Sequence, residues 1–312
     1  MKRCRIIYNP TAGRESFKSK LPDVLVKLEQ AGFETSVHET TEKGNATKAA
    51  TLAAERRFDT IVVAGGDGTI NEVITGLAES DYRPRVGIVP AGTTNDFARA
   101  LHIPKSVDKA VDIIVAGQTK KLDIGKVNQH YFVNISGGGK LTEVSYEVPS
   151  KLKTMIGQLA YIIKGAELLP RLRPIHTRIE YDGELFEGEI MMFLVANTNS
   201  VGGFEKLAPD AEMDDGVFDL LVLKKANIAE LLRAITAATR GAHFDDPNVL
   251  YVQAKNIRVE TDEKMQLNID GEYGGDLPGV FTNLKQHIEY YLPTDEQIKH
   301  SKADKEIEEA LD

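Results

Sequence analysis

The stretch Ile61–Glu72 constrains the fold most, because an apolar, β-branched run ends there abruptly in glycine. Residues 61–63 are typical of a buried strand, and Gly65–Thr69 follows as a turn before an apparent helix. This arrangement brings backbone N–H groups and the positive end of a helix dipole together, which suits a bound phosphate. Asp67 in the turn would repel a phosphate unless a cation lay between them. The stretch therefore indicates a nucleotide held with Mg²⁺, and hence phosphoryl transfer.

This motif is neither of two common phosphate-binding fingerprints. A P-loop would continue into Gly-Lys-Ser/Thr, and the dinucleotide fingerprint would need a third glycine three residues after Gly68. An ordinary strand-to-helix turn, with Asp67 as the helix cap, remains an alternative on the motif alone.

The first part of the chain alternates strand and helix patterns from Arg3 to about Asp123, which predicts a parallel sheet wrapped by helices. Polar turns at Asn9–Gly13 and Pro90–Asp96 also follow predicted strands. Because ligands on such sheets bind at the carboxyl ends of the strands, these turns and Gly65–Thr69 should converge on one site. The expected strands are Arg5–Tyr8, Phe33–His38, Asp59–Ala64 and Val86–Val89, and the expected helices are Phe17–Gln30, Ala46–Arg57, Ile70–Ala78, Asp96–Leu101 and Val107–Ala116.

Beyond Asp123 short strand-like segments alternate with turn pairs such as Asp182-Gly183 and Asp215-Gly216. We expect an antiparallel β-sandwich there, interrupted by helices at Lys153–Leu169 and Ile228–Arg240. The predicted fold class is thus α/β plus all-β. A doubly wound nucleotide-binding domain at 1–123 would precede a sandwich domain at 124–290, with the active site in the cleft between them. The last strand-like piece, His287–Leu292, could return to either domain, so about 291–312 could rejoin the first.

Composition narrows the class of protein. A chain of 312 residues is too long for one small core and suits two domains. The net charge of −9 argues against a general nucleic-acid binder. No window approaches about 18 uninterrupted apolar residues, and no signal-peptide region precedes the first predicted strand. We therefore expect a cytoplasmic protein in which the single cysteine, Cys4, is a small core residue.

Three carboxylates are expected at the nucleotide edge of the sheet. Asp67 and Asp96 lie in turns after predicted strands, and Asp123 ends a fifth strand pattern. Together they could hold Mg²⁺ directly or through its waters. Each of them could instead cap a turn.

A further carboxylate pair lies in the second domain, in the turn Asp270-Gly271-Glu272. Asp-Gly is a common hairpin signal, and alone it would indicate only a turn. Beside a nucleotide site, however, Glu272 could accept the proton of an attacking hydroxyl.

Four motifs, taken in order, resemble the diacylglycerol kinase catalytic-domain family, which includes sphingosine, ceramide and bacterial lipid kinases. They are Asn-Pro-x-x-Gly at 9–13, Gly-Gly-Asp-Gly-Thr at 65–69, Gly-Thr-x-Asn-Asp-Phe-Ala-Arg at 92–99 and Asp-Gly-Glu at 270–272. The resemblance covers the chain to about residue 292. It is nearest to the soluble bacterial enzymes of the family in length and in the stretch 145–153.

The resemblance implies transfer of phosphate from ATP, with Mg²⁺, to the free primary hydroxyl of diacylglycerol, giving phosphatidic acid for phospholipid metabolism. Glu272 would be the general base, and Asp67, Asp96 and Asp123 would form a carboxylate–water–Mg²⁺ network. The implied ATP contacts are Asn9, Pro10, Thr11, Ala12, Gly13, Thr40, Gly66, Asp67, Gly68, Thr69, Ile70, Asn71, Glu72 and Thr93.

The resemblance also implies a structural metal in the second domain, held by Asp215 and by the carbonyls of Glu212 and Val217. Ala12 departs from the family pattern, which often has serine there. The change puts one hydroxyl contact in doubt and leaves the backbone cradle unaffected.

The segment Lys151–Arg173 has five basic residues against one acidic residue around an apolar centre. It fits reversible docking on an anionic membrane at the inner face, although a helix packed on the sandwich would look the same. The candidate lipid contacts are Lys151, Lys153, Lys164 and Arg99. We expect ATP, diacylglycerol and the membrane surface as partners, and no nucleic acid. The sequence does not decide between a monomer and a homodimer.

Two alternatives remain. A kinase of the same superfamily could act on a sphingoid lipid or on NAD, since NAD kinases also carry Gly-Gly-Asp-Gly, although residues 92–99 speak against NAD. A nucleotide- or lipid-sensing module without catalysis is the other class, and intact Asp67 and Glu272 argue against it.

Overall fold

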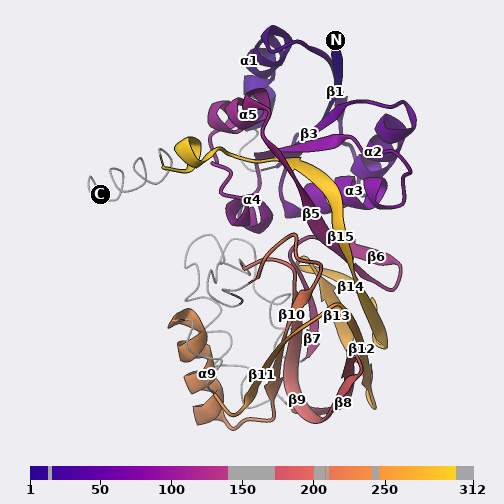
Figure 1. Cartoon of the computed structure of the whole chain (residues 1–312), viewed down its shortest axis with the longest axis vertical. Helices are drawn as coiled ribbons and strands as arrows, with labels where there is room; N and C mark the ends of the chain where they lie inside the picture. The colour runs from indigo at the N-terminus through magenta and orange to yellow at the C-terminus, as the bar shows by residue number, and fades with distance from the viewer. Residues whose placement is uncertain (13–15, 140–172, 200–207, 209–210, 241–245, 300–312) are drawn as a thin grey trace. The chain divides into compact units, whose positions relative to one another are not determined.

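A computed structural model describes residues 1–12, 16–139, 173–199, 208, 211–240 and 246–299 of the chain (Figure 1). The chain divides into two compact units. Unit 1 comprises Met1–Leu122 and His287–Asp312, and unit 2 comprises Asp123–Gln286. Two strands, β5 (Thr119–Val127) and β15 (Gly279–Tyr291), contribute residues to both units.

Unit 1 is built on a parallel sheet with the strand order β15–β4–β3–β1–β2. Its other strands are β1 (Lys2–Tyr8), β2 (Phe33–Glu39), β3 (Thr60–Gly65) and β4 (Arg85–Pro90). All six residues of β3 are buried, as expected of a strand covered on both faces. The strand order reverses between β1 and β3, and such a switch point is where open α/β sheets bind ligands.

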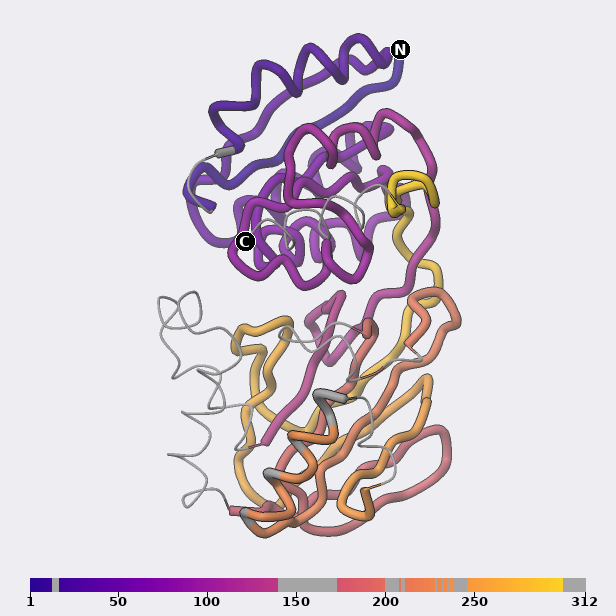
Figure 2. The backbone as a smooth tube through the Cα atoms, turned by 90° about the vertical axis from the view of Figure 1, so that its left-hand side faces the viewer, coloured from indigo at the N-terminus to yellow at the C-terminus, as the bar shows by residue number. Residues whose placement is uncertain are grey.

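Helices cover both faces of this sheet (Figure 1 and Figure 2). One face carries α1 (Ser16–Gln30) and α5 (Val107–Ala116), and the other carries α2 (Asn45–Glu55) and α3 (Asp67–Ala78). A short helix, α4 (Asp96–Ala100), follows β4. The predicted doubly wound α/β domain is confirmed. The helix expected from Ile70 begins three residues earlier, at Asp67, because the glycine turn itself starts the helical backbone.

Unit 2 is antiparallel throughout its described strand pairs. The strands are β6 (His130–Phe132), β7 (Ile135–Gly139), β8 (Ile175–Tyr181), β9 (Glu184–Ala196), β10 (Phe218–Lys224), β11 (Val249–Ala254), β12 (Asn256–Thr261), β13 (Gln266–Ile269) and β14 (Glu272–Asp276). They run in the order β14–β13–β7–β9–β8–β12–β15, and β10 pairs with β9 and β11.

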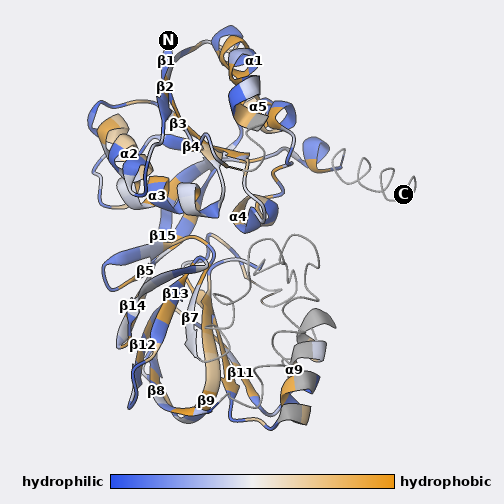
Figure 3. Cartoon of the chain, turned by 180° about the vertical axis from the view of Figure 1, so that it is seen from behind, coloured by the Kyte–Doolittle hydropathy of each residue, from blue (hydrophilic) through white to orange (hydrophobic). Residues whose placement is uncertain are grey.

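The core of unit 2 is centred on four fully buried phenylalanines from β6, β9, β10 and β15. They are Phe132, Phe193, Phe218 and Phe281. A smaller cluster joins β9 and β10 to α9 (Ile228–Arg240), and β9 is drawn largely in the hydrophobic colours of Figure 3. The predicted antiparallel domain and the predicted helix at 228–240 are therefore confirmed. The helix expected at 153–169 lies outside the described residues.

Candidate functional site

The polar loops after β1, β3 and β4 lie side by side at the carboxyl edge of the sheet in unit 1. The Asn9 N–H donates to the Ala64 carbonyl over 2.9 Å, and the Ala91 N–H donates to the Gly65 carbonyl over 2.9 Å. The Thr40 N–H donates to the Tyr8 carbonyl over 2.9 Å, so the end of β2 adjoins the same edge. The predicted convergence of the three turns is confirmed, except that Gly13 lies outside the described residues.

Two glycines let the loops after β3 and β4 meet backbone to backbone. A Cβ built on Gly92 would lie 2.5 Å from the Gly66 Cα, and one on Gly66 would lie 3.3 Å from the Gly92 Cα. The packing of the two loops therefore leaves no room for a side chain at either position. Close approach of a phosphate to the glycine turn at 65–69 stays a prediction.

Asp67 connects these two loops. It is the first residue of α3 and is half-buried. Its Oδ2 accepts a hydrogen bond from the Thr94 hydroxyl over 3.0 Å, and its Oδ1 accepts one from the Phe97 N–H over 3.3 Å. Asp67 thus supports the start of α4. Because each carboxylate oxygen has two lone pairs, both oxygens keep capacity for water or a cation.

The loop before α4 is closed by two side chains. Arg99 donates to the Asp96 carboxylate over 3.2 Å and to the Thr94 carbonyl over 2.9 Å. These contacts make Arg99 part of the loop, and its contact with lipid stays a prediction. Asn95 is buried and left-handed, with φ 52°, and its amide accepts from the Gly92 N–H and donates to the Gly92 carbonyl over 2.9 and 2.7 Å.

Sequence reasoning missed the role of Asn95. Asparagine tolerates the left-handed region and bonds readily to nearby backbone, so its place just before a helix start was the available signal.

Glu72 makes hydrogen bonds to the start of α2 that the sequence motif does not predict. Its carboxylate accepts from the N–H groups of Gly44 and Ala46 over 2.8 and 3.1 Å, which satisfies the open donors at the start of α2. The Thr47 hydroxyl donates to the Glu72 carbonyl over 3.0 Å. Glu72 therefore locks α2 onto α3, and its contact with ATP stays a prediction. Ile70 is fully buried and its N–H donates to the Gly66 carbonyl over 3.1 Å, so its contact with ATP also stays a prediction.

The turn that follows β1 is held at its start by the side chain of Asn9. The Asn9 side-chain oxygen accepts from the N–H and the hydroxyl of Thr11 over 3.0 and 2.9 Å. Thr93 and Gly68 are exposed, and Thr69, Pro10, Ala12 and Asn71 are half-buried. Backbone amides and hydroxyls of this kind are suitable donors to phosphate oxygens.

Asp123 belongs to unit 2, whereas Asp67 and Asp96 belong to unit 1. The fully buried carboxylate of Asp123 accepts from the Gly216 N–H over 2.7 Å and the Gln286 N–H over 2.6 Å. Burial raises the pKa of Asp123, and the charges of nearby Asp215 and Asp214 add to the rise, while the two N–H groups oppose it. A shared Mg²⁺ network of the three aspartates stays a prediction.

The predicted structural-metal residues lie in the turn next to Asp123. The Asp215 carboxylate accepts from the Val217 N–H over 2.9 Å, and the Asp215 carbonyl accepts from the Lys285 ammonium over 3.0 Å. The Val217 carbonyl accepts from the Asn283 amide over 3.1 Å. Glu212 is exposed. Oxygen donors of this kind suit a hard cation, although the described residues contain no cluster of three or more acidic, histidine or cysteine side chains placed to hold a metal.

The Asp270-Gly271 pair forms the hairpin turn between β13 and β14. The two residues have φ 48° and 90°, the pair of positive values that a type I′ turn requires. Glu272 then begins β14, directly opposite Ile269, and is exposed. An exposed carboxylate at a fixed register position is suited to receive a proton from a substrate.

The remaining predicted contacts and a surface hollow add little to the site. Lys151, Lys153 and Lys164 lie outside the described residues.

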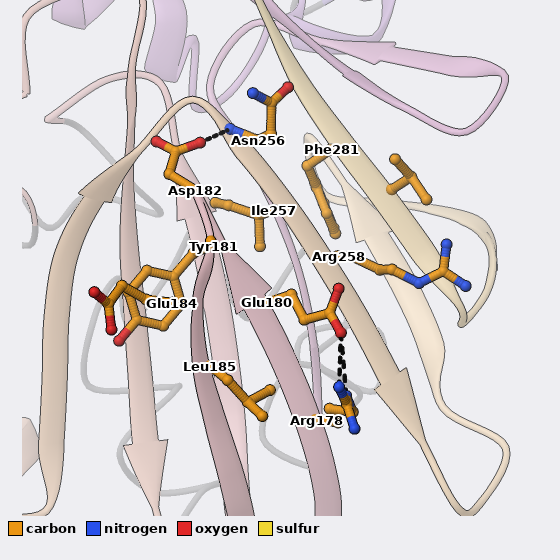
Figure 4. A pocket seen from close by; sticks show the side chains of 12 residues that line it. Arg178, Glu180, Tyr181, Asp182, Glu184, Leu185, Asn256, Ile257, Arg258 and Phe281 are labelled. Atoms are coloured by element: carbon orange, nitrogen blue, oxygen red, sulfur yellow. Dashed lines mark hydrogen bonds and ion pairs between the residues drawn. The ribbon is translucent and has the colours of Figure 1, made fainter.

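A hollow of about 590 Å³ lies over β8, β9, β12 and β15 of unit 2 (Figure 4). Its rim includes the ion pair of Arg178 and Glu180, whose Nη2 and Oε1 atoms are 2.9 Å apart, and none of the predicted site residues lines it. Within the described ranges, no helix has the length and apolar character needed to cross a bilayer.

Comparisons with known proteins agree over both halves of the chain. Residues 3–127 match the diacylglycerol kinase catalytic domain, and residues 142–290 match the YegS C-terminal NAD kinase beta sandwich-like domain. The diacylglycerol kinase of Bacillus subtilis (strain 168) is 62% identical over 294 residues, which cover 94% of this chain and 97% of that protein. The diacylglycerol kinase of Staphylococcus carnosus (strain TM300) is 55% identical, covering 94% of this chain and 96% of that protein.

A solved structure shows the same likeness. A crystal structure described as a candidate diacylglycerol kinase of Bacillus anthracis str. Sterne superimposes with a TM-score of 0.82 at 31% identity, covering 94% of this chain and 95% of that one. The family model that matches residues 142–290 is described as beta sandwich-like, which confirms the sandwich predicted from the sequence.

Proposed function

Because the chain belongs to the diacylglycerol kinase family of enzymes, we propose that it transfers the γ-phosphoryl group of ATP to the free primary hydroxyl of diacylglycerol. The products are ADP and phosphatidic acid, and Mg²⁺ is the metal. The observation that supports this most is the junction of three polar loops at the switch point of unit 1, where Asp67 bonds to the loop before α4.

Unit 1 would bind the nucleotide. The first turn of α3 presents backbone N–H groups at the positive end of the helix, and the loop after β4 adds the hydroxyl of Thr93. The Thr11 hydroxyl donates to Asn9 in the structure and would have to turn to the phosphate on binding. Asp67, with lone pairs to spare on both oxygens, fits a hydrated Mg²⁺ beside the phosphates. When bound, this ion would neutralise charge on the transferred phosphoryl group.

Glu272 would act on the acceptor. As the lipid oxygen bonds to the γ-phosphorus, the bond from phosphorus to the β-bridging oxygen breaks and the hydroxyl proton passes to the Glu272 carboxylate. The proton then leaves to solvent, to which this side chain is exposed. Asp96 and Asp123 complete the proposed Mg²⁺ network, and Asp215 with the carbonyls of Glu212 and Val217 is the proposed site of a structural Mg²⁺.

The reaction would take place at the cytoplasmic face of the membrane, because diacylglycerol resides in the bilayer. Lys151–Arg173 is the proposed docking segment, on the basis of its charge and apolar content. A requirement for anionic lipid would follow from this.

The test is transfer of label from γ-labelled ATP to diacylglycerol in mixed micelles, with and without anionic lipid. We expect labelled phosphatidic acid, and more of it when anionic lipid is present. A sphingoid base and NAD serve as separate acceptors. Labelling of either one without labelling of diacylglycerol would overturn the proposed substrate.

A further inference from the structure

Unit 2 contains two hairpins with the same sequence at the turn, Asp182-Gly183-Glu184 and Asp270-Gly271-Glu272. Their aspartates have φ 45° and 48°, and their glycines have φ 95° and 90°, so both are type I′ turns. The first joins β8 to β9 and the second joins β13 to β14. The two turns are therefore matched in sequence and in backbone.

In each hairpin the aspartate accepts hydrogen bonds from backbone N–H groups where another strand begins. Asp182 accepts from the Asn256 N–H over 2.9 Å (Figure 4) and from the Lys255 N–H over 2.8 Å. Its own N–H donates to the Asn256 carbonyl over 3.1 Å. This anchor is exposed to solvent.

Asp270 makes a stronger version of the same anchor. It is half-buried, and its carboxylate accepts from three consecutive N–H groups, those of Val133, Asn134 and Ile135, over 2.9, 2.9 and 3.0 Å. Its own N–H donates to the Ile135 carbonyl over 2.9 Å. Three successive N–H groups directed at one point form an anion site, and here the anion is part of the chain itself.

This anchor determines where the next carboxylate lies. The Gly271 N–H donates to the Asn268 side-chain oxygen over 2.9 Å, and Glu272 follows in register with Ile269. The turn is held from both sides, so the backbone of Glu272 has little freedom. A base that must meet a hydroxyl within hydrogen-bond reach depends on such support, because a misplacement of about 1 Å can cost about 100-fold in rate.

We propose that Asp270 is a positioning residue for the base Glu272, acting through its three bonds to residues 133–135. The inference rests on the proposed function, in which Glu272 takes the proton of the lipid hydroxyl. Asp182 is the matched anchor of a turn to which that function assigns no role.

The test compares Asp270→Asn with Asp182→Asn in the full-length protein. Asn-Gly also favours a type I′ turn, so the turn itself is kept. In either orientation of the new amide, at least one backbone N–H would face an NH₂ group instead of an oxygen. Faster amide hydrogen exchange at residues 133–135 in one variant, and at residues 255 and 256 in the other, would show that each anchor has been loosened.

We expect Asp270→Asn to lower kcat by about tenfold or more while the KM for ATP stays within about twofold, because only the base is displaced. Asp182→Asn should leave both constants within about twofold.

In a Glu272→Gln background, adding Asp270→Asn should lower the residual rate by less than about twofold, because the group being positioned is gone. If Asp270→Asn does not fold, Asn268→Ala loosens the same turn from its other side and should show a smaller loss in kcat alone.

Two results would contradict the positioning role of Asp270 without contradicting the assignment of Glu272 as the base. One is an unchanged kcat in Asp270→Asn despite fast exchange at residues 133–135. The other is an equal loss from Asp270→Asn with and without Glu272. Wild-type activity in Glu272→Gln would instead contradict the base assignment in the proposed function, so the two failures are distinguishable.

Discussion

The loop edge of unit 1 and the β13–β14 hairpin of unit 2 use their acidic side chains differently. In unit 1 the candidate acid Asp67 accepts hydrogen bonds from the segment around the start of α4, and the candidate acid Asp96 accepts one from Arg99. In unit 2 the structural bonds are made by Asp270, and the candidate base Glu272 is exposed two residues later. In unit 1 the proposed Mg²⁺ ligands thus also support the loop, whereas in unit 2 three bonds to neighbouring backbone come from Asp270, two residues before the proposed base.

This difference affects how a carboxylate substitution should be interpreted. Changing a residue that both supports a loop and serves the reaction alters stability, ligand binding and rate together. Changing Asp270, whose described side-chain bonds go to backbone N–H groups, alters support without removing the proposed reacting group.

Asp67→Asn should have the largest effect within unit 1. The Thr94 hydroxyl and the Phe97 N–H would share one remaining oxygen, and the charge that faces the proposed Mg²⁺ would be lost. We expect kcat/KM for ATP to fall by about 100- to 1000-fold, with a higher Mg²⁺ requirement. Steady-state kinetics over a range of Mg²⁺ concentrations provides the measurement. A reduced rate with an unchanged Mg²⁺ requirement would limit Asp67 to support of the loop.

Gly92→Ala should disrupt the loop junction. Its Cβ would lie 2.5 Å from the Gly66 Cα, so one backbone must move. We expect the free energy of unfolding to fall by about 1–3 kcal/mol, with weaker ATP binding. Denaturant unfolding and nucleotide titration measure the two effects.

The control for the junction is Gly188→Ala in β9, where the nearest atom to the new Cβ is 3.4 Å away, at the end of the Phe186 ring. That variant should retain both stability and ATP binding. Equal behaviour of the two alanine variants would mean that the loops are not packed as described.

Glu72→Gln separates support from nucleotide contact. The amide keeps one acceptor for Gly44 or Ala46 but removes the negative charge from the start of α2. We expect the free energy of unfolding to fall by about 0.5–2 kcal/mol, with the KM for ATP nearly unchanged. Thermal unfolding and ATP kinetics would be compared. A raised KM with unaltered stability would instead make Glu72 an ATP contact.

Asp123 should show the smallest effect, as a pH dependence. Its pKa is raised in the folded protein, so the folded state favours the protonated carboxyl. The stability it contributes is complete below the unfolded pKa and is lost as the pH rises through the folded pKa. The free energy of unfolding of the wild type, minus that of Asp123→Asn, should therefore increase as the pH is lowered from neutrality towards about 4. A difference that falls over that range would contradict the raised pKa.

Local sequence was sufficient for the features that local backbone chemistry controls. The β-branched run before Gly65 predicted β3, and the pairs Asp182-Gly183 and Asp270-Gly271 predicted hairpin turns. The Asp215-Gly216 pair was expected to do the same, but it lies just before β10, at the end of the segment 197–217 that joins β9 to β10, and is not a two-residue hairpin turn. The order of strands and turns predicted which loops would meet, because parallel strands place their carboxyl ends at one edge.

Contacts between distant segments could not be inferred in this way. Glu72 satisfies the start of a helix that precedes it by more than twenty residues, and Asp123 bonds to Gly216 and Gln286. No periodicity or short motif records such pairings. The sequence likewise contains Asp-Gly-Glu twice, and nothing within the two tripeptides distinguishes Glu272 from Glu184.

The most direct test of the proposed reaction is therefore to compare Glu272→Gln with Glu184→Gln, two identical changes in two turns of the same sequence. We predict that Glu272→Gln lowers kcat with diacylglycerol by about 100- to 10,000-fold with ATP binding near normal, whereas Glu184→Gln stays within about twofold of the wild type. Full activity in Glu272→Gln, or an equal loss in both variants, would contradict the account.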